Sequence, residues 1–284
     1  MNIQEIKQQS NQLYLRYRHQ IIPEFFYVGY VGILAQYLQS GIFSFFVSLF
    51  LCPISHGYVK CAMKLVDTKQ PILDYHDSLD GIFSFVKVAP AYLMRKAIIL
   101  MCILICLIPS FLTIQNLIPE FSIEWFSSLG NALIQTEYFI PQFEYISLIL
   151  ENTFLVVNII VCIFIYLFLT TLFIPVPYVM ELEEFSWTEC ITYSIRLMKK
   201  YFFQFIYLYI LYMPRHILYW MVTGCIVLWI GHLNEFLMLF CIVSSLFFYI
   251  EVFKGRFEIA KYLFYQKMRG EYHEEDEKYQ ESDY

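Results

Sequence analysis

Six long apolar segments alternate along the chain with shorter polar or charged stretches. The segments cover residues 21–38, 41–63, 97–117, 148–179, 203–230 and 236–252. A helix rises about 1.5 Å per residue, so about 20 apolar residues cross the roughly 30 Å hydrocarbon core of a bilayer. The pattern therefore predicts an all-α, polytopic membrane protein with six transmembrane helices.

Two amphipathic stretches lead without a linker into apolar segments. One lies around residues 79–87, before the third segment, and the other covers residues 186–199, before the fifth. The second opens on Ser186 and Glu189, the spacing of a capping box that satisfies the first free amides of a helix. Its apolar-to-small face consists of Trp187, Cys190, Ile191, Ser194, Ile195 and Met198. We predict two interfacial elbow helices on the cytoplasmic surface, with an elbow packed only on protein as the alternative.

The composition excludes an ordinary soluble domain. Hydrophobic residues make up 59% of the 284-residue chain and charged residues 15%, whereas ordinary globular domains carry about 25% charged residues. A soluble core of this size would not bury so much apolar surface. Lipid is therefore expected to solvate part of it.

The distribution of basic residues predicts the orientation of the segments. Of the 19 lysines and arginines, all except Arg215 lie before the first segment, from the end of the second to the start of the third, between the fourth and fifth, or after the sixth. The loop at residues 118–147, on the opposite side, carries only acidic charges. Loops rich in lysine and arginine stay in the cytoplasm, so both termini are predicted to be cytoplasmic.

Three regions follow from this pattern. Residues 1–20 form a polar cytoplasmic segment, residues 21–265 the six-helix transmembrane domain, and residues 266–284 an acidic cytoplasmic tail. A block of like charges repels itself, which predicts that the tail is disordered. The polar start has no short apolar region followed by small residues, so the first apolar segment is expected to act as an uncleaved anchor.

Arg215 is the most unusual polar residue, because it lies near the centre of the fifth apolar segment. A charge at mid-bilayer costs roughly 2.5–3.5 kcal/mol on insertion scales. Arg215 is therefore expected either to face the bundle interior, paired with a glutamate or with freed carbonyls, or to snorkel towards the cytoplasmic headgroups. His216 is expected to be a structural hydrogen-bond donor. The candidate intramembrane polar residues are Arg215, His216, Glu151, Asn152, Glu24 and Glu251.

Basic residues near the cytoplasmic ends of the segments are candidates for binding lipid headgroups. Clusters of lysine and arginine at this depth attract anionic lipids. The same residues are equally well explained as ordinary topology signals. The candidates are Lys60, Lys64, Lys199, Lys200, Lys254 and Arg256.

No assembled catalytic motif is present in the sequence. It contains neither a His-Glu-x-x-His zinc motif nor a Gly-x-Ser-x-Gly nucleophile turn, and it has no phosphate-binding glycine loop. Cys102 and Cys106 share a helix face, but no second pair completes a metal site. The basic residues form separate clusters rather than one stripe, which argues against nucleic-acid binding. The sequence therefore predicts a protein that is not an enzyme and has no metal or cofactor.

Three short stretches resemble a known family. Residues 53–65 and 80–85 have a small-residue exit followed by a Phe-rich elbow, residues 194–199 resemble a Ser-x-x-Leu-Met-Lys motif, and residues 260–265 resemble a closing Ala-x-x-x-Phe-Tyr motif. The pattern resembles the bacterial membrane proteins of the domain-of-unknown-function 975 family, which are distantly similar to the membrane domain of glycerophosphodiester phosphodiesterases. Lys200 departs from the pattern, since the family usually has Gly there. The resemblance implies six helices in the cytoplasmic membrane and no established activity, cofactor or catalytic residue.

We therefore expect a multi-pass protein of the bacterial cytoplasmic membrane with a non-enzymatic accessory, scaffolding or lipid-interacting role. The expected partners are the lipid bilayer, anionic lipids and another membrane protein. The first alternative is a small transporter or exporter component with a polar path near Arg215 and Glu151. The second is a membrane-embedded enzyme, which would need two polar groups that converge at a cavity.

Overall fold

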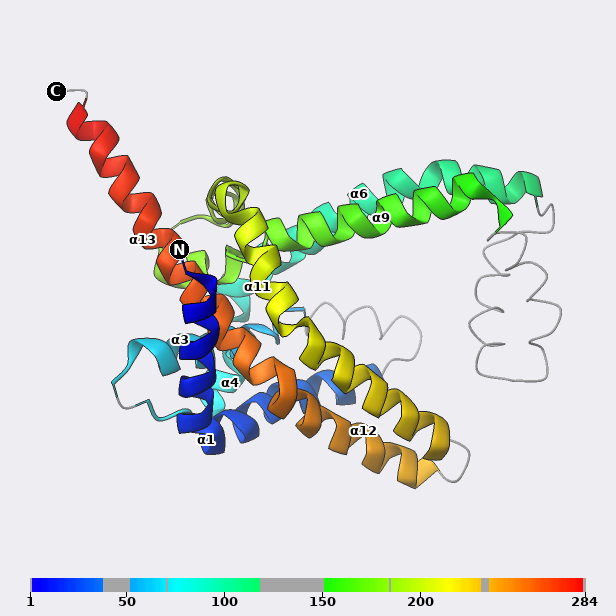
Figure 1. Cartoon of the computed structure of the whole chain (residues 1–284), viewed down its shortest axis with the longest axis horizontal. Helices are drawn as coiled ribbons and strands as arrows, with labels where there is room; N and C mark the ends of the chain where they lie inside the picture. Colours follow the sequence, from blue (N-terminus) through cyan, green and yellow to red (C-terminus); the bar gives the residue numbers. More distant parts are fainter. Residues whose placement is uncertain are drawn as a thin grey trace. The chain divides into compact units, whose positions relative to one another are not determined.

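The computed structural model describes residues 2–37, 52–69, 71–117, 151–183, 185–230 and 235–282. These residues are helical almost throughout and contain no strand, which confirms the predicted all-α class. The chain divides into two compact units (Figure 1). Unit 1 comprises Met1–Met94 and Leu172–Tyr284, and unit 2 comprises Arg95–Thr171.

Two of the helices, α6 and α9, each begin in one unit and end in the other. In chain order the described elements are α1 (Ile3–Tyr37), α3 (His56–Asp67), α4 (Tyr75–Ser78), α5 (Asp80–Phe83), α6 (Phe85–Leu117), α9 (Thr153–Leu172), α10 (Val176–Leu182), α11 (Trp187–Ile230), α12 (Glu235–Tyr249), the π-helical turn η2 (Ile250–Lys254) and α13 (Gly255–Ser282).

The last helix of the chain lies in the core of unit 1. Helix α13 packs against both α1 and α3, and α10 and α11 complete the surrounding layer (Figure 1). Aromatic side chains fill the space between them. Tyr178 lies 5.4 Å from Tyr262 and 5.3 Å from Tyr265, measured between ring centroids. Such pairs contribute about 0.5–1.5 kcal/mol beyond the burial of their area, so the C-terminal helix is a structural part of the unit.

Both ends of the chain are helical within the described residues. The stretch expected to be a polar cytoplasmic segment is the first half of α1, and the stretch expected to be a disordered tail continues α13. Each stretch has few apolar residues, and some of them are buried in unit 1, although Leu15 is exposed. The buried residues of these two stretches are Ile3, Ile6, Ser10, Tyr14 and Met268.

Three charged side chains lie together inside unit 1. The side chain of Glu258 is 2% exposed and forms ion pairs of 2.6 Å with both Lys254 and Lys261. These residues lie four before and three after it, so one helix face brings them together. The ammonium of Lys254 also lies 4.4 Å from the centroid of the Tyr58 ring. Lys254, predicted to contact lipid headgroups, is therefore engaged by protein groups.

Unit 2 consists, in its described part, of the main lengths of α6 and α9, which lie side by side (Figure 1). Asn158 of α9 joins them, because its Nδ2 donates to the carbonyl oxygen of Cys106 at 2.9 Å and to Oγ of Ser110 at 2.5 Å. Most of the large apolar side chains on both helices are exposed. The helices therefore have an apolar outer surface and a small polar contact between them.

Two segments of the described chain are long and apolar enough to cross a membrane, Phe85–Asn116 and Thr153–Leu182. They contain nearly all of the third predicted transmembrane segment and most of the fourth. The first half of the second segment lies outside the described residues, and its end belongs to the separate helix α3. The first, fifth and sixth fall on α1, α11 and α12, which are not among these two segments. The arrangement of six transmembrane helices is therefore not confirmed.

The second predicted elbow is not a separate helix. Ser186 and Glu189 form the predicted capping box, since the Ser186 amide donates to Oε2 of Glu189 at 2.8 Å and the Glu189 amide donates to Oγ of Ser186 at 3.4 Å. Helix α11 then runs without interruption to Ile230. Cys190, Ser194 and Met198, on the predicted membrane face, are fully buried in unit 1. The alternative, packing on protein, therefore fits this stretch better.

The first predicted elbow, unlike the second, exposes most of its apolar side chains. It consists of the short helices α4 and α5, followed directly by α6. Its large apolar side chains are exposed to a degree that ranges from 38% to 87%. We call this surface the α4–α5 patch, and it comprises Ile72, Tyr75, Ile82, Phe83 and Val86.

Candidate functional site

A group of acidic and basic side chains meets at the first residue of α3. The turn at residues 53–55 precedes this helix, and the amide of His56 donates to the carbonyl oxygen of Pro53 at 2.8 Å. The turn is held against α4 and α5 by two close backbone approaches. A Cβ on Gly57 would lie 1.7 Å from the carbonyl oxygen of Ser78, and one on Gly81 would lie 2.0 Å from that of Pro53. Only glycine fits at either position.

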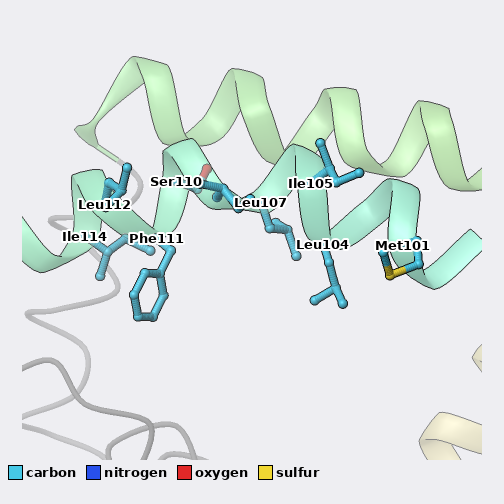
Figure 2. A pocket seen from close by; sticks show the side chains of 9 residues that line it. Met101, Leu104, Ile105, Leu107, Ser110, Phe111, Leu112 and Ile114 are labelled. Atoms are coloured by element: carbon cyan, nitrogen blue, oxygen red, sulfur yellow. The ribbon is translucent and has the colours of Figure 1, made fainter.

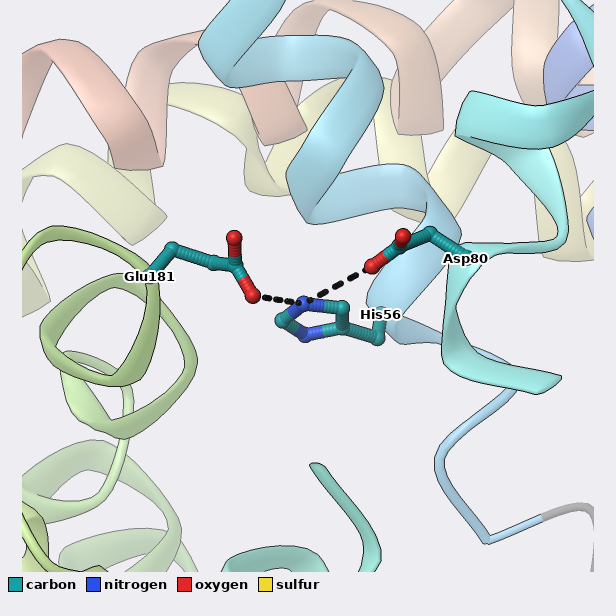
Figure 3. Close-up of side chains that lie close together, drawn as sticks. All are labelled: His56, Asp80 and Glu181. Carbon is teal, nitrogen blue, oxygen red and sulfur yellow. Dashed lines mark hydrogen bonds and ion pairs between the residues drawn. The ribbon is translucent and has the colours of Figure 1, made fainter. Parts of the chain in front are cut away.

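These approaches place His56 between two carboxylates (Figure 3). The side chain of His56 is fully buried, and its Nε2 lies 3.1 Å from Oε1 of Glu181 on α10 and 3.6 Å from Oδ2 of Asp80 on α5. Its Nδ1 lies 3.3 Å from the hydroxyl oxygen of Tyr92 on α6. Residues from four helices of unit 1 therefore converge on one imidazole ring.

Two lysines neutralise Glu181. Its side chain is 5% exposed and accepts from Nζ of Lys60 at 2.5 Å and from Nζ of Lys87 at 3.3 Å. A buried carboxylate is costly unless it is paired and hydrogen-bonded, and His56 with the two ammonium groups provides that pairing. Lys60 and Lys87 are themselves 35% and 58% exposed, so water reaches one side of the cluster. Lys60 is thus engaged by Glu181 as well as being a candidate for lipid binding.

A second group of charged side chains joins α3 to α4. Asp74 caps α4, since its Oδ1 accepts from the amides of His76 at 2.9 Å and Asp77 at 3.1 Å. Lys64 donates to Oδ2 of Asp77 at 2.6 Å. Another predicted headgroup lysine is therefore held by an acidic residue of unit 1.

The structure pairs Arg215 with an amide rather than with a predicted glutamate. Nη1 of Arg215 donates to Oδ1 of Asn11 at 3.0 Å. Glu251 accepts instead from the hydroxyl of Tyr14 at 2.6 Å and from Nε of Arg18 at 2.9 Å.

The other candidate intramembrane residues have separate contacts. Glu24 accepts a hydrogen bond from the hydroxyl of Ser78. His216 is an acceptor and not the expected donor, because Nε1 of Trp220 donates to its Nε2 at 3.0 Å. Asn152 caps α9, since its Oδ1 accepts from the amide of Leu155 at 3.2 Å, and Glu151 beside it is exposed. Among the described residues, these side chains therefore do not come together into the polar path that the transporter alternative needs.

The remaining headgroup candidates divide into two kinds. Arg256 donates to the carbonyl oxygen of Glu251, and its guanidinium lies 4.1 Å from the centroid of the Tyr14 ring. Lys199 and Lys200 are exposed on α11, with the Lys200 ammonium 5.2 Å from the ring of Tyr201.

An apolar groove of about 550 Å³ lies along α6 in unit 2 (Figure 2). Among the described residues that line it, Ser110 has the one polar side chain, and its hydroxyl already contacts Asn158. A groove without convergent polar groups fits hydrocarbon rather than a polar substrate. It therefore offers no catalytic constellation.

Sequence reasoning did not identify the cluster around His56. His56, Asp80 and Glu181 are separated by long stretches of chain, and no short motif joins them. The available signal was the pair of dipeptides His56-Gly57 and Asp80-Gly81, in which an ionisable residue precedes a glycine. Compared with protein-family models, curated proteins and solved structures, the chain matches none. The resemblance to the domain-of-unknown-function 975 family therefore stays a prediction.

Proposed function

We propose that this chain is a multi-pass protein of the bacterial cytoplasmic membrane with a non-enzymatic accessory role, in which unit 1 contacts lipid at the membrane surface. The observation that carries the proposal is the exposure of α6 and α9. Both are long and largely apolar, and most of their large apolar side chains are uncovered by the described parts of the chain.

A core helix of a soluble protein could have the same length and composition, but it would be buried. Residues such as Leu104, Phe164 and Leu167 are at least half exposed. Large contiguous apolar surfaces are unfavourable in water and normal in a bilayer. Asn158 supports the same interpretation, because its amide is hydrogen-bonded to α6, as a polar group in hydrocarbon must be.

The α4–α5 patch supports contact with the membrane surface. It lies immediately before the apolar part of α6 and exposes Phe83 at 58% and Val86 at 87%. Aromatic and aliphatic side chains in this position enter the boundary between headgroups and acyl chains. Lys87 follows Val86 directly in the sequence and places a positive charge next to the α4–α5 patch, where anionic headgroups would lie.

Membrane insertion is tested by washing membranes that contain the protein with alkaline carbonate. Retention in the membrane pellet is expected, and release into the supernatant would overturn the proposal. A variant with Leu104→Arg and Phe164→Arg places two charges on exposed positions of α6 and α9 and should reduce insertion. The pair Leu15→Arg and Gln8→Arg, which places two charges on exposed positions at the polar start of α1, is the matched control.

Contact between the α4–α5 patch and lipid is tested separately by fluorescence quenching. In the variant Phe83→Trp, the added tryptophan should be quenched by lipids brominated on their acyl chains. In Leu15→Trp, which is equally exposed but lies on α1, the added signal should not be quenched. Equal quenching of the two tryptophans would contradict a specific membrane contact at the patch.

A further inference from the structure

We propose that His56, Asp80 and Glu181 form a binding site for a divalent first-row transition metal ion, with Zn²⁺ as the representative case. One ligand atom from each residue, namely Nε2, Oδ2 and Oε1, lies within 4.8 Å of the other two (Figure 3). One imidazole and two carboxylates are a suitable donor set for such ions. The inference is independent of the proposed membrane role.

The protein groups alone leave one oxygen of this cluster unsatisfied. Oδ2 of Asp80 is buried and has no hydrogen-bond partner among the described residues. It faces Nε2 of His56 at 3.6 Å, but that nitrogen lies closer to Glu181, at 3.1 Å. One N–H group cannot serve two carboxylates well. A divalent cation at this position would be coordinated by both carboxylates and by the imidazole nitrogen.

Tyr92 allows His56 to bind a metal without losing its second hydrogen bond. When Nε2 coordinates the ion, the proton resides on Nδ1 and is donated to the Tyr92 hydroxyl oxygen, 3.3 Å away. When Nε2 is protonated and donates to Glu181, the same hydroxyl rotates and donates to Nδ1. Partners of this kind fix the tautomer and orientation of metal-binding histidines.

A small movement completes the coordination. Oxygen ligands bind Zn²⁺ at about 2.0–2.2 Å, so two of them on one ion lie at most about 4.4 Å apart. The three atoms lie within 4.8 Å of one another. Asp80 is the first residue of α5 and its side chain is 18% exposed. Its Oδ1 accepts from Oγ of Ser84 at 3.0 Å, so a small rotation that keeps this bond moves Oδ2 towards the ion. His56, held by its full burial, remains the fixed ligand.

Lys60 and Lys87 compete with the metal for Glu181. Each ammonium group stabilises the carboxylate in the metal-free protein, at 2.5 and 3.3 Å. Both side chains are partly exposed, so each can turn to water when an ion binds. The site therefore exchanges ammonium groups for a metal ion and keeps Glu181 paired in both states.

The experiment uses the full-length protein in detergent micelles and Co²⁺ as a spectroscopic probe. Wild-type protein should develop a visible absorption band upon Co²⁺ titration, and Zn²⁺ should abolish the band. Mg²⁺ and Ca²⁺, which prefer all-oxygen sites, should not abolish it at the same concentration. His56→Gln should weaken Co²⁺ binding at least about tenfold, and so should Tyr92→Phe, because loss of a supporting hydrogen bond costs about 10–100-fold. His19→Gln, an exposed histidine of α1, is the matched control and should bind as wild type.

Lys87→Met distinguishes the metal site from a purely structural ion-pair cluster. Removal of the competing ammonium should tighten Co²⁺ binding, by about tenfold given its distance from Glu181. Lys87 is mostly exposed, so this variant is expected to fold even where His56→Gln does not. The absence of a Co²⁺ band in both wild type and Lys87→Met would overturn the proposal. If the folded variants His56→Gln or Lys87→Met bound Co²⁺ with the affinity of the wild type, the proposal would also be overturned.

Discussion

Nε2 of His56 donates a hydrogen bond to Oε1 of Glu181 across 3.1 Å, although the two residues are 125 positions apart in the sequence. This contact connects the first residue of α3 with the end of α10. Lys60 and Lys87 bind the same carboxylate, so one acidic side chain holds three elements of unit 1 together.

Replacement of Glu181 by glutamine should therefore destabilise unit 1. The variant keeps the size of the side chain but leaves the ammonium groups of Lys60 and Lys87 without the carboxylate that they bind. Loss of one partner of a buried ion pair costs about 3–5 kcal/mol, and the partial exposure of both lysines places this case at the lower end, about 3 kcal/mol. Thermal unfolding in detergent measures the loss. Glu5→Gln, which removes an exposed ion pair to Lys267, should cost at most about 1 kcal/mol, and an equal effect of both variants would contradict this ranking.

Gly57→Ala and Gly81→Ala should each prevent the close packing of α3 against α4 and α5. The added Cβ would lie 1.7 Å from one backbone oxygen and 2.0 Å from another, and a backbone atom cannot move aside as a side chain can. Overpacking of this kind costs about 1–3 kcal/mol or more. Gly224→Ala in α11 is the control, because no atom lies within 4 Å of its added Cβ. It should be neutral or stabilising by up to about 1 kcal/mol.

Glu258 should make the stability of unit 1 sensitive to acid. Burial alone would raise the pKa of Glu258, but the nearby ammonium groups of Lys254 and Lys261 outweigh it and lower the pKa from 4.5 to about 2. A carboxylate whose pKa is lower in the folded than in the unfolded protein stabilises the fold above the unfolded pKa. That contribution is lost as the pH falls from about 4.5 towards about 2. Unfolding temperatures measured across this range should fall with pH.

Glu258→Gln provides the control for this pH dependence. At neutral pH the variant should be less stable than wild type by about 3–5 kcal/mol. The difference should shrink as the pH approaches the lowered pKa, because the wild-type side chain then also loses its charge. A difference that stays constant with pH would exclude Glu258 as the titrating group.

Asn158 should stabilise the pairing of α6 and α9. Asn158→Ala removes hydrogen bonds to the Cys106 carbonyl and to Ser110, and hydrogen bonds between membrane helices contribute about 0.6 kcal/mol each, at most about 1.7. Ser110→Ala should have a smaller effect. A double-mutant cycle of the two variants should give a non-zero coupling energy, whereas additive losses would show that the two side chains act independently.

The sequence by itself determined the all-α class, the two long apolar helices of unit 2 and the capping box that begins α11. These features depend on interactions between residues near one another in the chain. Hydropathy over about 20 positions indicates whether a helix suits lipid, and a capping box needs residues only three positions apart. Neighbouring residues therefore suffice to predict them.

The tertiary structure decided which faces are buried and which charges meet. Cys190, Ser194 and Met198 of the predicted membrane face are covered by protein, and both polar ends of the chain contribute buried residues to the core. The cluster at His56 depends on Gly57 and Gly81 at a backbone contact between separate helices. Such contacts arise from packing between distant segments, and neither hydropathy nor motif spacing contains that information.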